Sequence, residues 1–446
     1  MKPLLLFTGP PATRSGYGAH ARDLLHSLIQ MDRFDIKINS LRWGNTPMNA
    51  LNEQNPKDKL IIDRILTEGN LPKQPEIHIQ LSVPNEFNPL AKYNIGITAG
   101  IECTLPKPEW IDGLNRMDMN LVPSEFTKQV FESVKYDRID EKTQQKAGQL
   151  GLQKPMGVLF EGVDTNIYKK TNEFSEEFVE QMNQIEENFC FLYVGHWLQG
   201  DLGQDRKDTG MLVKTFLEKF KNMKKPPALI MKTSHSSFSV IDRREILKKI
   251  NDIRQSVEAK VYPNIYVLHG DLDDEEMNEL YNHPKVKVHI SFTKGEGFGR
   301  PLLEASLSEK PVMVSNWSGQ LDFLNKNNAI LLPGNLTNVH KSALPKEMLV
   351  DGAQWFTVNY QYAAQMMFKV FKEYRNYTMA AKRLAMSNKI FSLDMMTSKF
   401  SNILDACLPN FEEQPQAVDL KLPKLKKIGD KDKLPKLKLP KLKKVT

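Results

Sequence analysis

The stretch that decides the fold is GEGFGRPLLEA, which runs from Gly295 to Ala305. It follows the apolar run Val286–Phe292, which predicts a buried strand, and it leads into apolar residues at helical spacing. Pro301 stands where the first helical position is expected, and a missing N–H costs nothing there. Gly297 and Gly299 lack side chains, so a diphosphate could approach the free N–H groups at the start of the helix. The stretch therefore predicts a strand–turn–helix unit with an anion-binding turn.

Two carboxylates flank this turn. Glu296 lies in the loop and Glu304 in the first helical turn, eight residues later. A bound nucleotide sugar could meet one of these carboxylates at its sugar and the other at its ribose. The simpler alternative is that Glu304 is an acid of the helix start and Glu296 a solvated loop residue.

Outward from this unit, short apolar runs alternate with amphipathic segments in both halves of the chain, which is typical of βαβ units and parallel sheets. The candidate strands of the first half are Leu4–Phe7, Ile36–Ser40, Ile77–Leu81, Asn94–Thr98, Met119–Val122 and Gly157–Phe160, with a helix over Ala21–Ile29. Those of the second half are Phe189–Val194, Ala228–Lys232, Ile265–Leu268, Val286–Phe292 and Pro311–Ser315, with helices over Met211–Phe220, Asp242–Ala259, Asp274–Tyr281 and Pro301–Ser308. We therefore expect an α/β protein of two Rossmann-like domains with the ligand site in the cleft between them.

The predicted division is a first domain of residues 1–168, a second domain of residues 169–385, a closing helical segment of residues 386–410 and a tail of residues 411–446. The domain boundary falls where the sequence turns polar, around Tyr168–Phe178. Gln354–Arg375 and Met379–Ile403 are predicted to be helical.

The motif in its setting resembles the donor motif of the family-4 retaining glycosyltransferases, which have the two-domain GT-B fold. The resemblance implies that Glu296 contacts the hydroxyls of the donor sugar and Glu304 those of the ribose. It also implies that the donor is bound by the rest of the motif, namely Gly297, Phe298, Gly299 and Arg300.

Tyr193–Trp197 and the following DRKD segment resemble the strand and basic loop that open the second domain in that family. Lys207 matches the family's loop lysine, which holds the donor diphosphate together with an arginine. The family commonly has this arginine directly after the glycine, but here His196 follows Gly195. The arginine's role is thus left to Arg206 or to no residue, and an Arg–Lys pair in a polar loop is otherwise a solvated surface.

Two regions of the first half resemble cleft-facing turns of the family. The loop Gly9–Gly18 contains Gly16 and Gly18, whose N–H groups could meet phosphate, although a plain turn explains it too. Glu102 follows a strand where many relatives have a histidine, so it is predicted to be an acceptor-side or sugar-side residue, with a surface acid as the alternative. In the second half, Gly319 with Asp322 fits a glycine-containing turn of the family, or a simple helix start.

Asp271 and Asp273 form a D-x-D pattern, which binds metal in the other glycosyltransferase fold. Here the acids precede Glu275–Met277, so we interpret them as the cap of a helix. No histidine or cysteine spacing indicates a metal site, and the three cysteines indicate neither a disulfide framework nor zinc. With no run of about 18 apolar residues and no signal peptide, we expect a cytoplasmic protein.

The net charge of +7 is concentrated at the end of the chain. Eleven lysines against three aspartates give the segment Asp419–Thr446 a charge of +8, so the rest carries −1. This segment repeats LPKLK three times, and its prolines and lysines forbid a packed helix, so we expect it to be disordered or extended. Lys421–Lys444 could bind nucleic acid or an anionic surface, or serve only as a solubilising extension.

Taken together, the patterns predict transfer of a sugar from a UDP- or GDP-sugar, with retention of anomeric configuration and without a separate cofactor. The acceptor could be a glycan, a lipid-linked glycan or modified DNA, the last as in glycosyltransferases of viruses, including phages. Two alternatives remain at this point. A nucleotide-dependent oxidoreductase shares the Rossmann halves but lacks its G-x-G-x-x-G fingerprint here. A nucleic-acid-binding protein with an inactive body would not need Glu296, Glu304 and Lys207.

Overall fold

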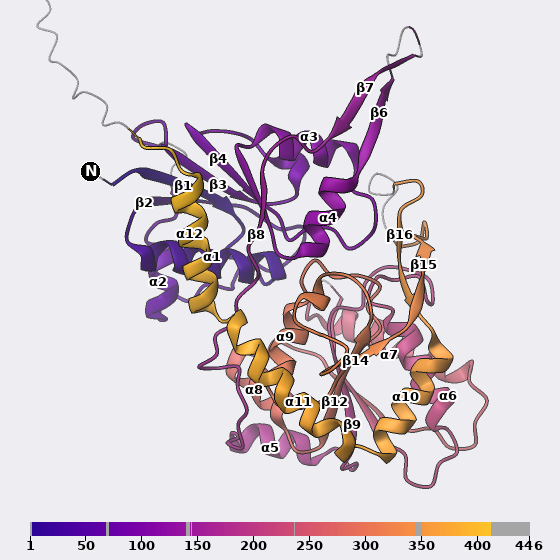
Figure 1. Ribbon diagram of the computed structural model, residues 1–446. Helices are drawn as coiled ribbons and strands as arrows, with labels where there is room; N and C mark the ends of the chain where they lie inside the picture. Colours follow the sequence, from indigo (N-terminus) through magenta and orange to yellow (C-terminus); the bar gives the residue numbers. More distant parts are fainter. Residues whose placement is uncertain are drawn as a thin grey trace, which may run out of the picture. The chain divides into compact units, whose positions relative to one another are not determined.

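The computed structural model describes residues 2–67, 71–139, 143, 145–235, 237–343 and 350–411 (Figure 1). The first domain is built on a six-stranded parallel sheet with the order β2-β1-β3-β4-β5-β8. Its strands are β1 (Leu4–Gly9), β2 (Asp35–Ser40), β3 (Ile77–Leu81), β4 (Tyr93–Ile97), β5 (Met119–Val122) and β8 (Met156–Val158). Its helices are α1 (Gly16–Met31), α2 (Pro56–Ile62), α3 (Pro108–Arg116) and α4 (Glu125–Ser133), with a short 3-10 turn η1 (Pro84–Glu86).

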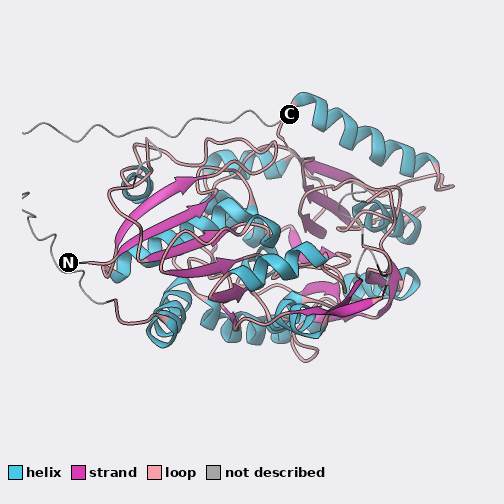
Figure 2. Cartoon of the chain, turned by 90° about the horizontal axis from the view of Figure 1, so that it is seen from above, coloured by secondary structure: helices cyan, strands magenta, loops and turns pink. Residues whose placement is uncertain are grey.

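The second domain repeats this plan with the strand order β11-β10-β9-β12-β13-β14, again parallel throughout. Figure 2 shows the strands, in magenta, with helices, in cyan, around them. Its strands are β9 (Cys190–Val194), β10 (Ala228–Lys232), β11 (Ile265–Leu268), β12 (Val286–Ser291), β13 (Val312–Ser315) and β14 (Ile330–Leu332). Its helices are α5 (Glu176–Asn183), α6 (Thr209–Phe220), α7 (Val240–Gln255), α8 (Asp274–Asn282), α9 (Arg300–Ser306), α10 (Tyr360–Lys372) and α11 (Arg375–Asn388), with a 3-10 turn η2 (Gly319–Asp322). Two α/β domains with parallel sheets confirm the predicted fold class.

The second sheet is buried on both faces, which explains its almost continuous apolar strands. Along β9, Phe191 and Tyr193 pack into one apolar cluster, with side chains of α6, α7 and α10. The alternate residues Cys190 and Leu192 pack into another, with side chains of α5, α8 and α9. Because successive strand residues point to opposite faces, both clusters need apolar residues from the same strand.

Three secondary-structure predictions were wrong or incomplete. Gln354–Val358, predicted as helix, is strand β16, which pairs antiparallel with β15 (Gly334–Asn338), and helix α10 begins only at Tyr360. The predicted helix Met379–Ile403 is broken, because α11 is followed by a 3-10 turn η4 (Lys389–Phe391) and Ser392 then caps a new helix, α12 (Leu393–Cys407). An antiparallel hairpin that projects from the first domain, β6 (Lys135–Ile139) with β7 (Lys146–Gly151), was not foreseen (Figure 1).

The chain passes between the domains twice, and the two passages lie side by side. Val163, on the way to the second domain, forms a parallel bridge with Ser392, on the way back. Helix α12 then packs on α1 of the first domain, where the hydroxyls of Thr397 and Ser27 form a hydrogen bond of 2.8 Å. The predicted basic tail falls within residues 412–446, outside the described residues.

Candidate active site

A cleft of about 540 Å³ lies where strands of both sheets end. The first domain contributes residues beyond β1, β4 and β8, among them Gly16, Glu102 and Glu161. The second contributes residues beyond β9, β10 and β12, among them Lys207 and Glu296. Ligands of parallel α/β sheets bind at the carboxyl ends of the strands, so this is the candidate active site.

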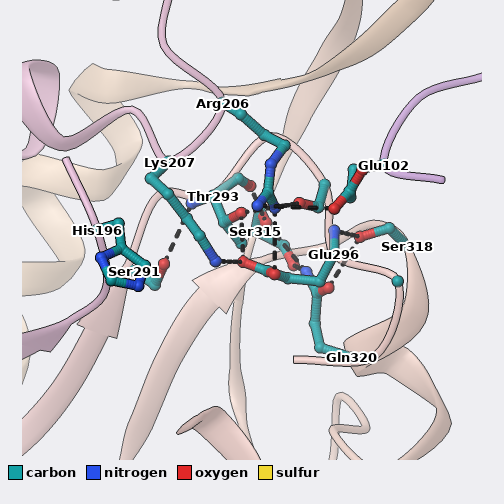
Figure 3. Close-up of polar contacts among 12 residues, drawn as sticks. Glu102, His196, Arg206, Lys207, Ser291, Thr293, Glu296, Ser315, Ser318 and Gln320 are labelled. Carbon is teal, nitrogen blue, oxygen red and sulfur yellow. Dashed lines mark hydrogen bonds and ion pairs between the residues drawn. The ribbon is translucent and has the colours of Figure 1, made fainter. Parts of the chain in front are cut away.

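Glu296 accepts hydrogen bonds from three other side chains (Figure 3). Its Oε1 accepts hydrogen bonds from Lys207 Nζ at 2.5 Å and from the Thr293 hydroxyl at 2.7 Å. Its Oε2 accepts one from Arg206 Nη1 at 3.2 Å. The loop that carries it, residues 293–299, is called the glycine loop below.

Charge keeps the Glu296 carboxylate ionised despite its burial. Burial alone would raise its pKa, but the charges of Lys207 and Arg206 outweigh burial, and with hydrogen bonds from Lys207 and Thr293 they lower the pKa to about 2. Conversely, burial lowers the pKa of Lys207, and the Glu296 charge opposes that shift. The site therefore holds one anion between two cations before any ligand arrives.

Arg206 also joins the two domains. Its Nη1 donates to the Gly295 carbonyl at 2.7 Å, and its Nη2 lies 3.6 Å from Oε1 of Glu102 in the first domain. The structure thus brings Arg206 to the site, and its role in place of the family's arginine stays a prediction. His196, which follows Gly195, bonds to the Ser234 hydroxyl at 3.0 Å, and burial together with the Lys207 charge lowers its pKa.

The glycines of the loop allow close packing between backbones. A Cβ at Gly295 would lie 2.1 Å from the Glu102 carbonyl oxygen, and one at Gly297 would lie 1.9 Å from that of Ala99. The Ser124 hydroxyl donates to the Gly297 carbonyl at 2.6 Å. Glycine is therefore required here for contact with the first domain, whatever the loop also offers a ligand.

The helix after the loop begins one residue earlier than predicted. Gly299 is the N-cap, with φ of 99°, so Arg300 is the first helical residue and Pro301 the second. The Arg300 guanidinium bonds to Asp23 of α1 and, at 3.0 Å, to Glu304. Glu304 also accepts from the Tyr281 hydroxyl at 3.1 Å, and burial raises its pKa to about 7 against the Arg300 charge.

The structure brings most predicted site residues to the cleft but not all. Those that line it are Gly16, Glu102, Gly195, His196, Arg206, Lys207, Glu296, Gly297, Phe298, Gly299 and Arg300. Gly18 instead lies inside α1, where its N–H is taken by the Ser15 hydroxyl. Gly319 packs behind the glycine loop, where a Cβ would lie 2.0 Å from the Gly297 carbonyl oxygen, and Glu304 is turned to Arg300 and Tyr281.

Sequence reasoning missed several cleft residues. Tyr17 stacks on Trp43 with 3.9 Å between ring centroids, and both line the cleft beside Glu161. Lys232, at the end of β10, lies over the Phe238 ring and bonds to the Gly270 carbonyl at 2.5 Å. Lys232 could have been found by looking beyond each predicted strand, but no motif marks Trp43 or Glu161.

Behind the cleft, a buried ion pair fixes the basic loop. Lys294 and Asp208 lie 3.3 Å apart with side chains 1% and 0% exposed. Asp208 also accepts from the Tyr360 hydroxyl at 2.7 Å, and Lys294 donates to the Thr357 hydroxyl at 2.7 Å. Since Lys207 precedes Asp208, this network fixes the position from which Lys207 reaches Glu296.

The D-x-D pattern caps a helix, as predicted. Asp273 accepts from the Glu276 N–H at 2.8 Å, while the Glu276 carboxylate accepts from the Asp273 N–H, which makes a full capping box for α8. Asp271 pairs with Arg14 at 2.5 Å.

Part of the chain matches the model of a known protein family. Residues 251–344, which contain the glycine loop, match the family described as glycosyl transferases group 1. No curated protein matches the chain significantly. None of the described helices is long and apolar enough to cross a membrane.

Solved structures resemble almost the whole chain. A glycosyltransferase from Rickettsia africae has a TM-score of 0.58 and 16% identity, covering 92% of this chain and 100% of its own. Sucrose-phosphate synthase from Thermosynechococcus elongatus has a TM-score of 0.58 and 13% identity, and the match covers 91% of this chain and 99% of that protein. Anabaena HepE, in complex with UDP and glucose, has a TM-score of 0.56 and 11% identity, and the match covers 91% of this chain and 100% of that protein. The likeness shows a GT-B fold, and with the group 1 match it supports a GT-B glycosyltransferase.

Proposed function

We propose that this chain is a retaining glycosyltransferase of family 4 that transfers a sugar from a nucleotide-diphosphate sugar to an acceptor. The observation that carries the proposal is the carboxylate of Glu296, held in the cleft between Lys207 and Arg206. One acid ready to accept from sugar hydroxyls beside two cations suits a substrate that joins a neutral sugar to an anionic diphosphate.

The ion pairs describe the site before the donor binds. A diphosphate entering the cleft competes with Glu296 for Lys207 and Arg206, because its two phosphates and the Glu296 carboxylate are all anionic and can pair with the same two cations. As the cations turn to the phosphates, Glu296 becomes free to accept hydrogen bonds from the sugar. Arg300 and Glu304 would then face the ribose end of the donor.

The chemical step breaks the bond between the anomeric carbon and the diphosphate, whose oxygen leaves with the electron pair. Positive charge grows on the sugar ring and negative charge on the leaving oxygen. Lys207 and Arg206 stabilise the latter, and removing one such group from an active site commonly costs about 10²–10³-fold in kcat. The acceptor oxygen bonds to the anomeric carbon on the face that the diphosphate leaves, so configuration is retained, and the acceptor's proton passes to the leaving diphosphate oxygen.

On the donor, we propose a UDP- or GDP-sugar and no separate cofactor. HepE was solved with UDP-glucose, which makes UDP-glucose the first donor to test. For the acceptor we keep a glycan, a lipid-linked glycan or modified DNA, because the first-domain wall of the cleft carries no residue pattern that selects among them.

The test is release of free nucleotide from a panel of UDP- and GDP-sugars. We expect slow release from one donor by the wild type and at least about a hundredfold less by Glu296→Ala. Glu177→Ala, which changes an exposed glutamate on α5, is the matched control and should release nucleotide at the wild-type rate. Equal release by the wild type and Glu296→Ala would refute the assignment of Glu296, and the absence of any donor binding would refute the proposal.

A further inference from the structure

Glu161 is a carboxyl that the proposed mechanism does not use. It follows β8, and its backbone neighbours are fixed at the passage between the domains. Gly162 packs against Leu393 so closely that a Cβ would lie 2.9 Å from the Leu393 Cα, and Val163 donates to the Phe391 carbonyl at 3.0 Å. The backbone on the C-terminal side of Glu161 is thus firmly held.

The Glu161 side chain is buried yet has no partner. It is only 9% exposed, and it lines the cleft. It forms no hydrogen bond or ion pair with any other residue that the structure describes. The other buried acids nearby are all engaged: Glu296 with Lys207, and both Asp23 and Glu304 with Arg300. The Glu161 carboxyl opens on the cleft, so a ligand group that enters there can form a hydrogen bond with it.

The surroundings of Glu161 favour its protonated form. Burial raises the pKa of its carboxyl most, the Arg300 charge opposes this, and nearby carboxylates raise it further, to about 7. The charged groups that act electrostatically on it are Asp23 of helix α1, Arg300 and Glu304 of helix α9, and Glu296 of the glycine loop. Glu161 in turn acts on Tyr17 of helix α1.

These neighbours also indicate which part of the donor Glu161 would meet. It lines the same cleft as Glu296, proposed for the sugar end, and Arg300, proposed for the ribose end. The diphosphate joins those two ends of the donor. An ionised carboxylate would repel the diphosphate, whereas a protonated carboxyl can donate a hydrogen bond to it.

Building on the proposed function, we propose that Glu161 is a further donor-binding residue, whose protonated carboxyl donates a hydrogen bond to the diphosphate of the nucleotide sugar. Donor binding is then linked to a proton. Below about pH 7 the carboxyl already carries it, and affinity does not change with pH. Above pH 7 each binding event takes up a proton, so affinity falls by up to about tenfold per pH unit.

The experiment measures the Kd of UDP-glucose, or of the donor that the panel identifies, between pH 6 and 8.5. Three proteins are compared: wild type, Glu161→Gln, whose amide donates at every pH, and Glu304→Gln, which removes the other carboxyl with a pKa of about 7. We expect wild type and Glu161→Gln to bind about equally at pH 6. At pH 8.5, which is 1.5 units above 7, wild type should bind about thirtyfold more weakly than Glu161→Gln. Glu304→Gln should still bind more weakly as pH rises, but the fall should begin at a lower pH, because loss of the Glu304 charge lowers the pKa of Glu161.

Each other result overturns the inference. A wild-type to Glu161→Gln ratio that stays constant with pH, or wild-type binding that strengthens as pH rises, contradicts a donating carboxyl. Loss of the pH dependence in Glu304→Gln alone would assign the proton to Glu304. If Glu161→Gln does not fold, calorimetry of the wild type at pH 8 in two buffers of different ionisation enthalpy decides, because about one proton should be taken up per donor bound. A donor that binds and turns over without these effects refutes this inference alone, whereas no donor binding refutes the proposed function with it.

Discussion

The two walls of the cleft are built in different ways. The charged residues at the centre of the second-domain wall, Arg206, Lys207 and Glu296, come from two short segments, Asp205–Asp208 and the glycine loop, which contact each other through these side chains. The first-domain wall comes from single residues that are far apart in the sequence, including Tyr17, Trp43 and Glu161. A site made of contiguous segments is visible in a sequence, and a site gathered by folding is not. The difference also predicts where substitutions act, because charge dominates one wall and packing the other.

The largest effect should follow a change on the charged wall. Lys207→Met keeps the length and burial of the side chain but removes a cation from the leaving diphosphate, so kcat should fall about 10²–10³-fold. The measurement is nucleotide release at saturating donor. Lys225→Met, at an exposed position of the same domain, should retain wild-type kcat. A fall of less than about threefold would mean that Lys207 does not meet the diphosphate.

A slightly smaller effect should appear in stability when the support behind that wall is broken. Lys294→Met leaves Asp208 buried without its cation, which should lower the free energy of unfolding by about 3 kcal/mol. Chemical denaturation measures this loss. The double variant Lys294→Met/Asp208→Leu should recover part of it, because no lone charge then stays buried. If the double variant is less stable than Lys294→Met, burial of a lone Asp208 charge is not the cause of the loss, and this explanation is wrong.

On the packed wall the expected effect is modest. Trp43→Ala removes the ring stacked on Tyr17, and such a contact is worth about 1 kcal/mol, so the donor KM should rise about fivefold with kcat nearly unchanged. Steady-state kinetics separate the two parameters. A drop in kcat as large as that of Lys207→Met would break the comparison, since the first domain would then act in the chemical step.

Deletion of residues 411–446 is expected to leave donor turnover unchanged. The +8 charge of Asp419–Thr446 predicts that the tail binds polyanions, so deletion should abolish retention of the protein on immobilised DNA at low salt. If retention survives the deletion, the tail is only an extension. If donor release falls as well, the tail takes part in the site, and the separation between tethering and catalysis fails.

The contrast between contiguous segments and scattered residues also explains which parts of the fold and the site could be predicted from the sequence. The parallel sheets were predictable because fully buried strands are apolar runs between helical patterns, and Glu296 with Lys207 because they sit in compact motifs. Trp43 and Glu161 lie in irregular segments whose neighbours reveal nothing until the chain folds. Gln354–Val358 resembled a helix because its apolar residues run on into α10, while its partner strand, Gly334–Asn338, has no apolar alternation. The break at Ser392 did have a signal, a serine N-cap with Asp394 in the first turn, that could have ended the earlier helix.

Helix α12 has a consequence for how the protein is made. It covers α1, with Met396, Phe400 and Leu404 buried, but it is the last described helix to leave the ribosome. All six strands of the first sheet are complete by Val158, whereas α12 begins at Leu393. At translation rates of about 5–20 residues per second, the side of α1 that α12 covers stays uncovered for roughly 10–50 s. A nascent chain in that interval exposes a surface for chaperones to hold, and a transcript cut short before Leu393 would leave that surface exposed for good.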